Sequence, residues 1–305
     1  MRPWTADVRG PGARDRRPEP AVPSGARWGA LQPIQLLAVG RLLFPLLWLV
    51  LAGLALRSAL AFGVDSRLRS ATWIGAALMP ALVAPGGGAV DSGYAELFVT
   101  TALSGVACGM LTKDAVLVVA GTVVVALVKP EGPAYAGLLL LALAVAGLRA
   151  RGLTKTALGV VAALGVVSVS ALLATRRGSL PYERIPDVLL GEAANLLVVR
   201  RYGFVWILLG VLAVLPRRLV GPCPSPALGW LVLGGLSVAP APFLLWPDVT
   251  VEHHLRSSMP RLLLHWAAPG WLLAMAWLAR SGADRTERRD ELDTPRDRGA
   301  STMSA

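Results

Sequence analysis

The run LLFPLLWLVLAGLALRSALAFGV, residues 42–64, decides the fold class of this chain. Only Arg57 interrupts it with a charge. It is long enough to cross a bilayer's hydrocarbon core of about 30 Å, which takes roughly 20 apolar residues in a helix. A stretch of this kind predicts a membrane-spanning helix rather than a core helix of a soluble domain.

The rest of the chain has the same character. Hydrophobic residues make up 54% of its 305 residues and charged residues only 16%, which is far from the balance of a soluble domain. Further apolar runs follow at residues 71–85, 94–111, 115–128, 134–148, 156–175, 203–215, 227–246 and 262–279. The sequence therefore predicts an all-α, polytopic transmembrane helical bundle with about nine spans, in a range of about eight to ten.

Polar segments flank this membrane domain, which we expect to cover residues 29–280. Residues 1–28 are basic and rich in Pro, Gly and Arg, without apolar periodicity, so they predict a disordered segment. Residues 281–305 form a polar tail that we also expect to be disordered. Little of the chain is left for a soluble domain.

The formal charge of +11 raises the question of nucleic acid. The basic residues lie in the two tails and in short connections between apolar runs, not in one folded patch. This pattern indicates positive loops beside a bilayer, with no nucleic-acid partner. The arginine-rich composition is typical of a GC-rich genome, so we expect a multi-pass protein of a bacterial plasma membrane.

The positive loops also predict an orientation. Loops at residues 67–69, 149–155 and 217–218 carry the Arg and Lys clusters and should be cytoplasmic. If every run crosses, the basic N-terminus lies outside, against the same rule. Either residues 42–64 do not cross once, or an upstream segment belongs before them. The loops expected on the outer face are then residues 86–92, 129–133, 176–202 and 247–261.

Ionisable groups gather in these outer loops, at the ends of apolar runs. Asp91, Tyr94 and Glu96 open one run, and Lys129 with Glu131 joins two others. Such groups are costly beside a membrane unless they serve a function, so they are candidate site residues. The alternative is that Lys129 and Glu131 only anchor a helical hairpin at the interface.

The outer loop at residues 176–202 has an amphipathic pattern. Ile185, Val188, Leu189, Leu196 and Leu197 recur at helical spacing against a polar set of Asp187, Glu192 and Asn195. The loop can therefore form a helix that lies flat on the membrane and roofs a cavity. A plain connecting loop with one amphipathic turn is the alternative.

The stretch VEHHLRSSMPRLLLHWAAP, residues 251–269, places polar groups between two apolar runs. His254, Arg256 and Arg261 offer donors and positive charge beside the bilayer, as a lipid-linked phosphate or pyrophosphate requires. A zinc site from His253, His254 and His265 is disfavoured. Adjacent histidines on a helix diverge, and no cysteine or carboxylate completes the set. We predict no metal site.

Three strings of this chain together resemble a known family. Gly-Tyr-Ala-Glu at residues 93–96 is similar to a Gly-Tyr-Ala-Asp string, and Lys-Pro-Glu-Gly at residues 129–132 to a Lys-x-Glu-Gly string. Residues 254–269 resemble His-Leu-x-x-Ser-x-x-Arg-Leu-Leu-x-x-x-x-Pro with small offsets. These strings, in this order, are found in polytopic membrane glycosyltransferases of the GT-C class, such as mannosyltransferases and aminoarabinose transferases.

The resemblance implies transfer of a hexose, mannose or arabinose-like sugar from a polyprenyl-phosphate donor to an acceptor outside the membrane. It implies that His254, Arg256 and Arg261 bind the carrier phosphate, and that Lys129 and Glu131 position the cavity wall. Asp91, Tyr94 and Glu96 would face the sugar. A divalent cation commonly lies beside the carrier phosphate in this family.

In that family the general base is an acidic residue in a first large outer loop, for which this chain shows no counterpart. The resemblance thus implies a truncated or inactive member, or one completed by a separate chain that supplies the loop, and no catalytic residue is assigned. A non-catalytic membrane protein or partner subunit is the alternative. A transporter with Glu96, Lys129 and Glu131 as relay groups is a third option, although no inverted repeat supports it.

Overall fold

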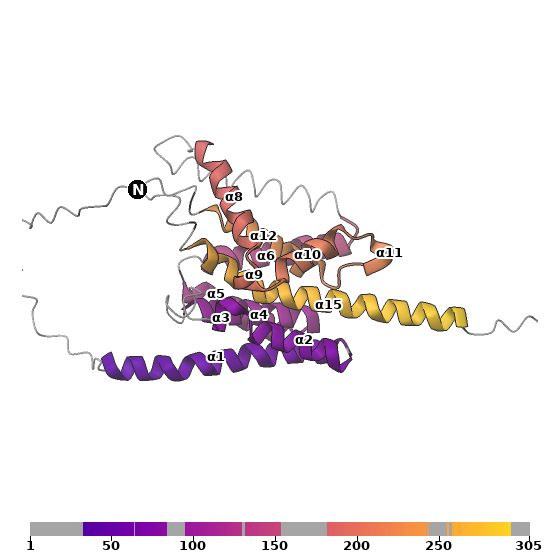
Figure 1. The fold of residues 1–305 in the computed structure, drawn as a ribbon, viewed down its shortest axis with the longest axis horizontal. Helices are drawn as coiled ribbons and strands as arrows, with labels where there is room; N and C mark the ends of the chain where they lie inside the picture. The colour runs from indigo at the N-terminus through magenta and orange to yellow at the C-terminus, as the bar shows by residue number, and fades with distance from the viewer. Residues whose placement is uncertain are drawn as a thin grey trace, which may run out of the picture. The chain divides into compact units, whose positions relative to one another are not determined.

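The computed structural model describes residues 33–63, 65–83, 95–129, 132–153, 182–241, 243, 255 and 258–293. Regular structure in these residues is helical, which confirms the all-α prediction for this part of the chain (Figure 1). The chain divides into two compact units, residues 1–39 and 40–305. The first contributes only residues 33–39 to the description, and all packing below lies within the second.

The helices follow one another along the chain with short connections wherever both ends are described. They are α1 (Pro33–Ala61), α2 (Ser66–Ala77), α3 (Pro80–Val83), α4 (Ala95–Thr112), α5 (Ala115–Val128), α6 (Gly132–Ala150), α8 (Ile185–Leu196), α9 (Val199–Tyr202), α10 (Val205–Val214), α11 (Arg217–Val220), α12 (Pro226–Val238) and α15 (Met259–Asp293). A short 3-10 helix, Tyr182–Arg184, leads into α8.

Three helices have the length and composition to cross a membrane. Their apolar parts are Leu43–Ala61 in α1, Gly132–Ala150 in α6 and Met259–Ala283 in α15. Four other apolar helices of the described residues are shorter: Glu96–Thr112, Ala115–Val128, Val205–Val214 and Pro226–Val238. The three candidate spans indicate a multi-pass membrane protein, and the prediction of nine spans is wrong.

Prolines explain part of that difference, because hydropathy counts apolar residues and does not register helix breaks. The runs that form α4, α5 and α10 yield helices that are shorter than the three candidate spans. The run at residues 71–85 is divided into α2 and α3 just before Pro80. Helix α12 ends ahead of Pro240, inside the run at residues 227–246. Proline cannot donate the backbone hydrogen bond that a continuing helix needs. The run at residues 156–175 lies outside the described residues.

Helix α15 is the central element of this unit. It contacts α2, α4, α8, α9, α10, α11 and α12, and it runs beside α4 in Figure 1. Its apolar window is 78% buried, against 22% for those of α1 and α6. Helix α15 is therefore surrounded by protein, whereas α1 and α6 expose most of their surface. α15 also continues to Asp293, into the tail that was expected to be disordered.

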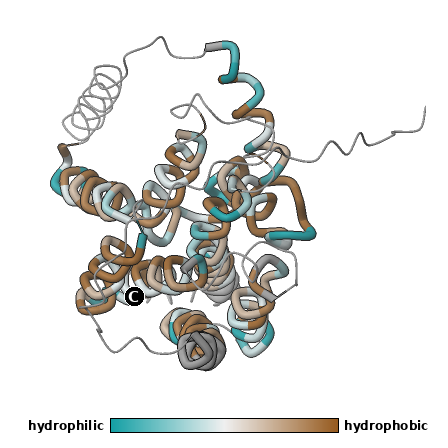
Figure 2. The backbone as a smooth tube through the Cα atoms, turned by 90° about the vertical axis from the view of Figure 1, so that its left-hand side faces the viewer, coloured by the Kyte–Doolittle hydropathy of each residue, from teal (hydrophilic) through white to brown (hydrophobic). Residues whose placement is uncertain are grey.

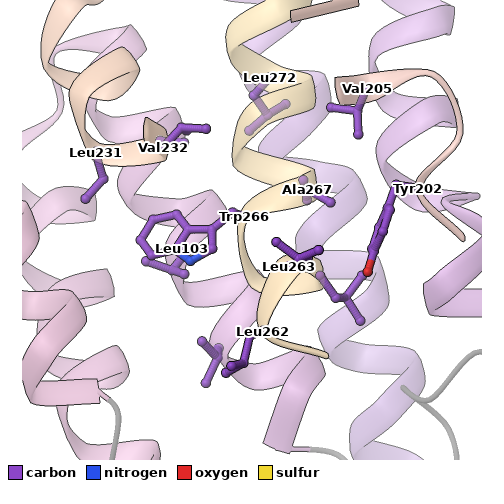
Figure 3. Close-up of a cluster of buried hydrophobic side chains, with 14 of the residues drawn as sticks. Leu103, Tyr202, Val205, Leu231, Val232, Leu262, Leu263, Trp266, Ala267 and Leu272 are labelled. Carbon is purple, nitrogen blue, oxygen red and sulfur yellow. The ribbon is translucent and has the colours of Figure 1, made fainter. Parts of the chain in front are cut away.

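The core is built around Trp266 of α15, which is fully buried. It belongs to one apolar cluster with Leu103 of α4 and with Leu231 and Val232 of α12 (Figure 3). A Cβ atom at Gly235 of α12 would lie 2.1 Å from the Trp266 ring. Only glycine at this position lets the indole lie directly against α12.

The helices are apolar along much of their length (Figure 2), and many of their large apolar side chains are exposed. On α5, the side chains of Val116, Val119, Val123 and Leu127 are all more than half exposed. Their spacing places them on one helix face. A continuous exposed apolar stripe is unusual on a soluble protein, and lipid contact accounts for it here.

The single charge in the opening apolar run has a partner. Arg57 Nη2 donates to Asp114 Oδ2 over 2.6 Å, and Asp114 caps α5 by accepting from the backbone N–H groups of Val116 and Leu117. The Leu117 N–H and the Arg57 guanidinium lower the pKa of Asp114. Arg57 thus ties α1 to the turn between α4 and α5.

Candidate functional site

Four polar side chains from four elements meet inside the helical core. Glu96 lies in the first turn of α4, Lys129 caps the end of α5, Tyr135 lies on α6 and His265 on α15. Glu96, Tyr135 and His265 are 4%, 3% and 0% exposed. Buried polar groups on this scale need partners, and these four supply them to one another.

The contacts form a continuous chain from Lys129 to Tyr135. Glu96 Oε2 forms an ion pair with Lys129 Nζ and lies 2.5 Å from His265 Nε2. On the other side of the imidazole, Nδ1 is 3.2 Å from the Tyr135 hydroxyl. A neutral His265 satisfies both contacts, because Nε2–H donates to Glu96 while Nδ1 accepts from the Tyr135 hydroxyl. We call these four residues the buried network.

Local structure brings the network together at helix ends. The first turn of α4 favours a carboxylate, because the helix dipole is positive there. The connection from α5 to α6 is tight, since a Cβ atom on Gly132 would lie 2.0 Å from the Val125 carbonyl oxygen. Glycine at residue 132 therefore permits the turn that places Lys129 and Tyr135 near each other.

Aromatic contacts hold the inner end of the network. The Tyr135 ring meets the His265 imidazole edge to face, with centroids 5.7 Å apart. It meets the Trp266 indole in the same manner at 5.1 Å. Such T-shaped pairs are favourable geometries for aromatic rings. They fix the ring of His265 and, through it, the carboxylate of Glu96.

The members of the buried network differ in how much of each side chain is exposed to solvent. The Lys129 side chain is 17% exposed, whereas those of Glu96 and His265 are 5% and 0% exposed. Within the described residues, Glu96 is the only partner of the Lys129 ammonium, which has three protons to donate. Both contacts to Glu96 use Oε2. A ligand approaching the network would therefore meet Lys129 first.

The structure locates three of the eight predicted site residues. Glu96 and Lys129 are in direct contact. Arg261 lies one helical turn before His265 on α15, and its buried Nε has no hydrogen-bond partner in the described part of the chain. The other five predicted residues lie outside the described residues: Asp91, Tyr94, Glu131, His254 and Arg256.

Sequence reasoning missed Tyr135 and gave His265 only a disfavoured zinc role. A signal was present, because each is a polar side chain inside a long apolar run, where polar groups are costly without a partner. The sequence pattern could not show that His265 pairs with Glu96. His265 and Glu96 are separated by 169 positions in the sequence.

The described residues do not fit a divalent cation. They contain no group of three or more His, Cys, Asp or Glu that could hold a metal ion. Within the network, Glu96 is the only carboxylate, and its Oε2 already accepts from two donors. Both nitrogens of His265 have partners. Divalent cations such as Mg²⁺ and Ca²⁺ take several oxygen ligands.

Helix α8 forms as predicted, but its sides are divided differently. Val188 is buried and Asp187 is exposed, as expected, whereas Glu192 of the polar set is buried and Leu189 and Leu197 of the apolar set are exposed. The buried side packs against α15. Burial raises the pKa of Glu192 from 4.5 to about 7. The exposed leucines fit a helix that touches lipid on its outer side.

Replacing Glu192 with glutamine is expected to stabilise the protein at alkaline pH only. Because the folded-state pKa is raised to about 7 from 4.5, the contribution of Glu192 to stability is greatest below the lower value and falls as the pH rises, until it levels off above the higher one. E192Q should gain roughly 2 kcal/mol at pH 8.5, which is the full shift reduced for solvent screening, and almost nothing near pH 4. Unfolding curves in detergent at both pH values measure this, and an equal gain at both would contradict the assignment.

The fold and the site define a class: a multi-pass membrane protein, all-α in its described part, with a buried ion pair completed by histidine and tyrosine from two further helices. No family model, curated protein or solved structure matches the chain. A functional assignment therefore rests on the network and on the strings that supply it.

Proposed function

We propose that this chain is the membrane core of a glycosyltransferase-like protein of the bacterial plasma membrane. It binds a sugar linked to polyprenyl phosphate and serves its transfer to an acceptor on the outer face. One observation carries the proposal. Two of the strings that resemble the GT-C class contribute Glu96 and Lys129 to the buried network, and the third string, residues 254–269, contains His265 at a position that its pattern leaves open.

This convergence supports a binding site because apolar packing does not require it. The strings lie in separate parts of the chain, and each could have met lipid or another helix instead. Polar groups inside a membrane bundle are costly, and those that persist commonly mark binding or relay sites. A phosphate-bearing lipid carrier calls for cations near the membrane edge, and Lys129 and Arg261 are such groups.

The roles that follow are limited to groups in the described residues. Lys129 and Arg261 supply positive charge for the carrier phosphate. The Glu96 carboxylate can accept a hydrogen bond from a sugar hydroxyl through Oε1, since its contacts in the described residues use Oε2. Glu96 is already the counter-ion of Lys129, so we do not assign it as the base that takes the acceptor's proton.

A non-catalytic, carrier-binding subunit is the second candidate. The contacts of Glu96 favour this candidate, because a carboxylate that already accepts from Lys129 and His265 is a weak base. In that case a separate chain supplies the base. The two candidates share the binding site and differ in turnover.

Donor turnover in membranes tests the proposal. Membranes containing the full chain are given polyprenyl phosphate carrying a labelled sugar, and release of label from the lipid is measured. R261A should lower turnover about 10- to 100-fold, the effect of losing a hydrogen-bonded charge. R218A, which removes an exposed arginine of α11, is the matched control and should leave turnover unchanged.

The outcomes separate the candidates at equal protein level. Turnover in the wild type that falls in R261A supports the glycosyltransferase. Saturable binding of the carrier without turnover supports the subunit. Neither binding nor turnover would overturn the proposed function, and turnover equal in R261A and the wild type would remove Arg261 from the site.

A further inference from the structure

We propose that Lys129 is the residue of the buried network that contacts the phosphate of the lipid carrier, and that Glu96, His265 and Tyr135 position its ammonium group. This assignment rests on the proposed function and deepens it. The sequence had suggested only that Lys129 shapes the cavity wall. The network now gives Lys129 a direct role and gives roles to two residues that the strings did not single out.

Exposure decides which member of the network can touch a ligand. His265 is sealed at 0% exposure and the Glu96 side chain is nearly so at 5%, whereas Lys129 retains 17%. The ammonium has three donors, and in the described residues it contacts one carboxylate oxygen. It can therefore donate to a phosphate oxygen without leaving Glu96.

The order of the contacts explains how the ammonium is held. In the neutral imidazole that satisfies both contacts, the Tyr135 hydroxyl donates to Nδ1 and the ring proton lies on Nε2, which points at Glu96. A hydrogen bond to one ring nitrogen sets the protonation of the other in this way. The Nε2–H group then fixes the carboxylate, and the carboxylate fixes Nζ. Each link removes freedom that a flexible lysine otherwise has.

A purely structural role explains these observations less well. Lysine at the end of a span can place its ammonium in the interface without any partner. A buried ion pair adds little stability compared with apolar side chains of the same size. The arrangement instead orients one cation, with Arg261 as a second cation one turn from His265, roughly 6 Å along the helix axis.

The charges of the site suit the ligand. Lys129 and Arg261 each carry one positive charge and Glu96 carries one negative charge, which leaves one net positive charge. A sugar linked to a lipid through phosphate is a phosphodiester with one negative charge. Charge-assisted hydrogen bonds from an ammonium and a guanidinium are strong contacts for such a group.

Binding of a defined lipid tests the assignment. The full chain, purified in nanodiscs, is titrated with radiolabelled polyprenyl phosphate and, separately, with the polyprenol that lacks the phosphate. The wild type should bind the phosphate form at least about tenfold more tightly. K129Q should lose most of this preference while its affinity for the polyprenol stays unchanged. K113Q, at an exposed lysine beyond the other end of α4, is the matched control and should keep the preference.

Two further variants keep the test decisive if K129Q folds poorly. K129R retains the ion pair and should retain the preference. Y135F keeps the ring and loses the hydrogen bond to His265, so the preference should fall a few-fold while the affinity for the polyprenol stays unchanged. Full preference in Y135F would overturn the positioning role of His265 and Tyr135.

The outcomes distinguish the two proposals. A wild type that binds both lipids equally would overturn the proposed function and this inference together. A wild type with the preference and a folded K129Q with the same preference would overturn only the assignment of Lys129. Displacement of the lipid by an equal concentration of inorganic phosphate would show a free phosphate site and overturn the lipid carrier as the ligand.

Discussion

Replacing Glu96 with leucine is expected to destabilise the folded protein by about 3–5 kcal/mol, the usual cost of breaking a buried ion pair from one side. The loss of stability comes from the two polar groups that E96L leaves without an acceptor. Lys129 Nζ and His265 Nε2 lose their shared acceptor, Glu96 Oε2, and water cannot replace it at His265, which is 0% exposed. Denaturant unfolding of the detergent-solubilised chain, followed by tryptophan fluorescence, measures the loss.

The double variant E96L/K129M provides the control. Removing both charges leaves no orphaned ammonium, so most of the lost stability should return. The single variant K129M should lie between the wild type and E96L. If the double variant is as unstable as the sum of the two single ones, Glu96 and Lys129 do not form the ion pair.

Replacing Trp266 with alanine should also cost about 3–5 kcal/mol, as large-to-small changes in a packed core do. Trp266 is fully buried and packs against Tyr135 on one side and Gly235 of α12 on another. Its loss leaves a cavity between three helices. W230A is the matched control, because Trp230 is 41% exposed, and its cost should stay within about 1 kcal/mol.

Coupling to Gly235 tests the same packing from the other side. In the wild type, G235A should destabilise strongly, since its Cβ would lie 2.1 Å from the Trp266 ring. In W266A the new methyl group has room, and G235A should cost little. Equal costs in both backgrounds would contradict the close approach of α12 to α15.

The sequence predicted the helical, membrane character of this chain because long apolar runs leave few other structures. The run at residues 115–128 predicts the bounds of α5, Ala115–Val128, without error. Local chemistry explains this success, because Asp114 caps the first turn and the charge of Lys129 ends the apolar run. Where such residues mark both ends of a helix, the sequence pattern is enough to predict its bounds.

Other features depend on tertiary packing and could not be read from local patterns. The number of long spans was overestimated because prolines such as Pro80 and Pro240 divide or end apolar runs, and because runs such as residues 115–128 and 203–215 form helices too short to qualify. The burial of Glu192 and the exposure of Leu189 on α8 were not predicted, because they depend on how this helix packs against its neighbours. The pairing of Glu96 with His265 required knowledge of which helix packs against α4.

Photo-crosslinking of the lipid tests directly whether the carrier binds beside the buried network. The full chain in native membranes is exposed to a polyprenyl phosphate that carries a diazirine on its first isoprene unit, and the labelled peptides are mapped by mass spectrometry. If the carrier binds there, label is expected at three places: the first turn of α4, the region of Lys129, or the first two turns of α15. Addition of unlabelled polyprenyl phosphate should remove this label. Label confined to lipid-facing residues such as Val116 and Val119, and unaffected by the unlabelled lipid, would contradict binding of the carrier beside the network.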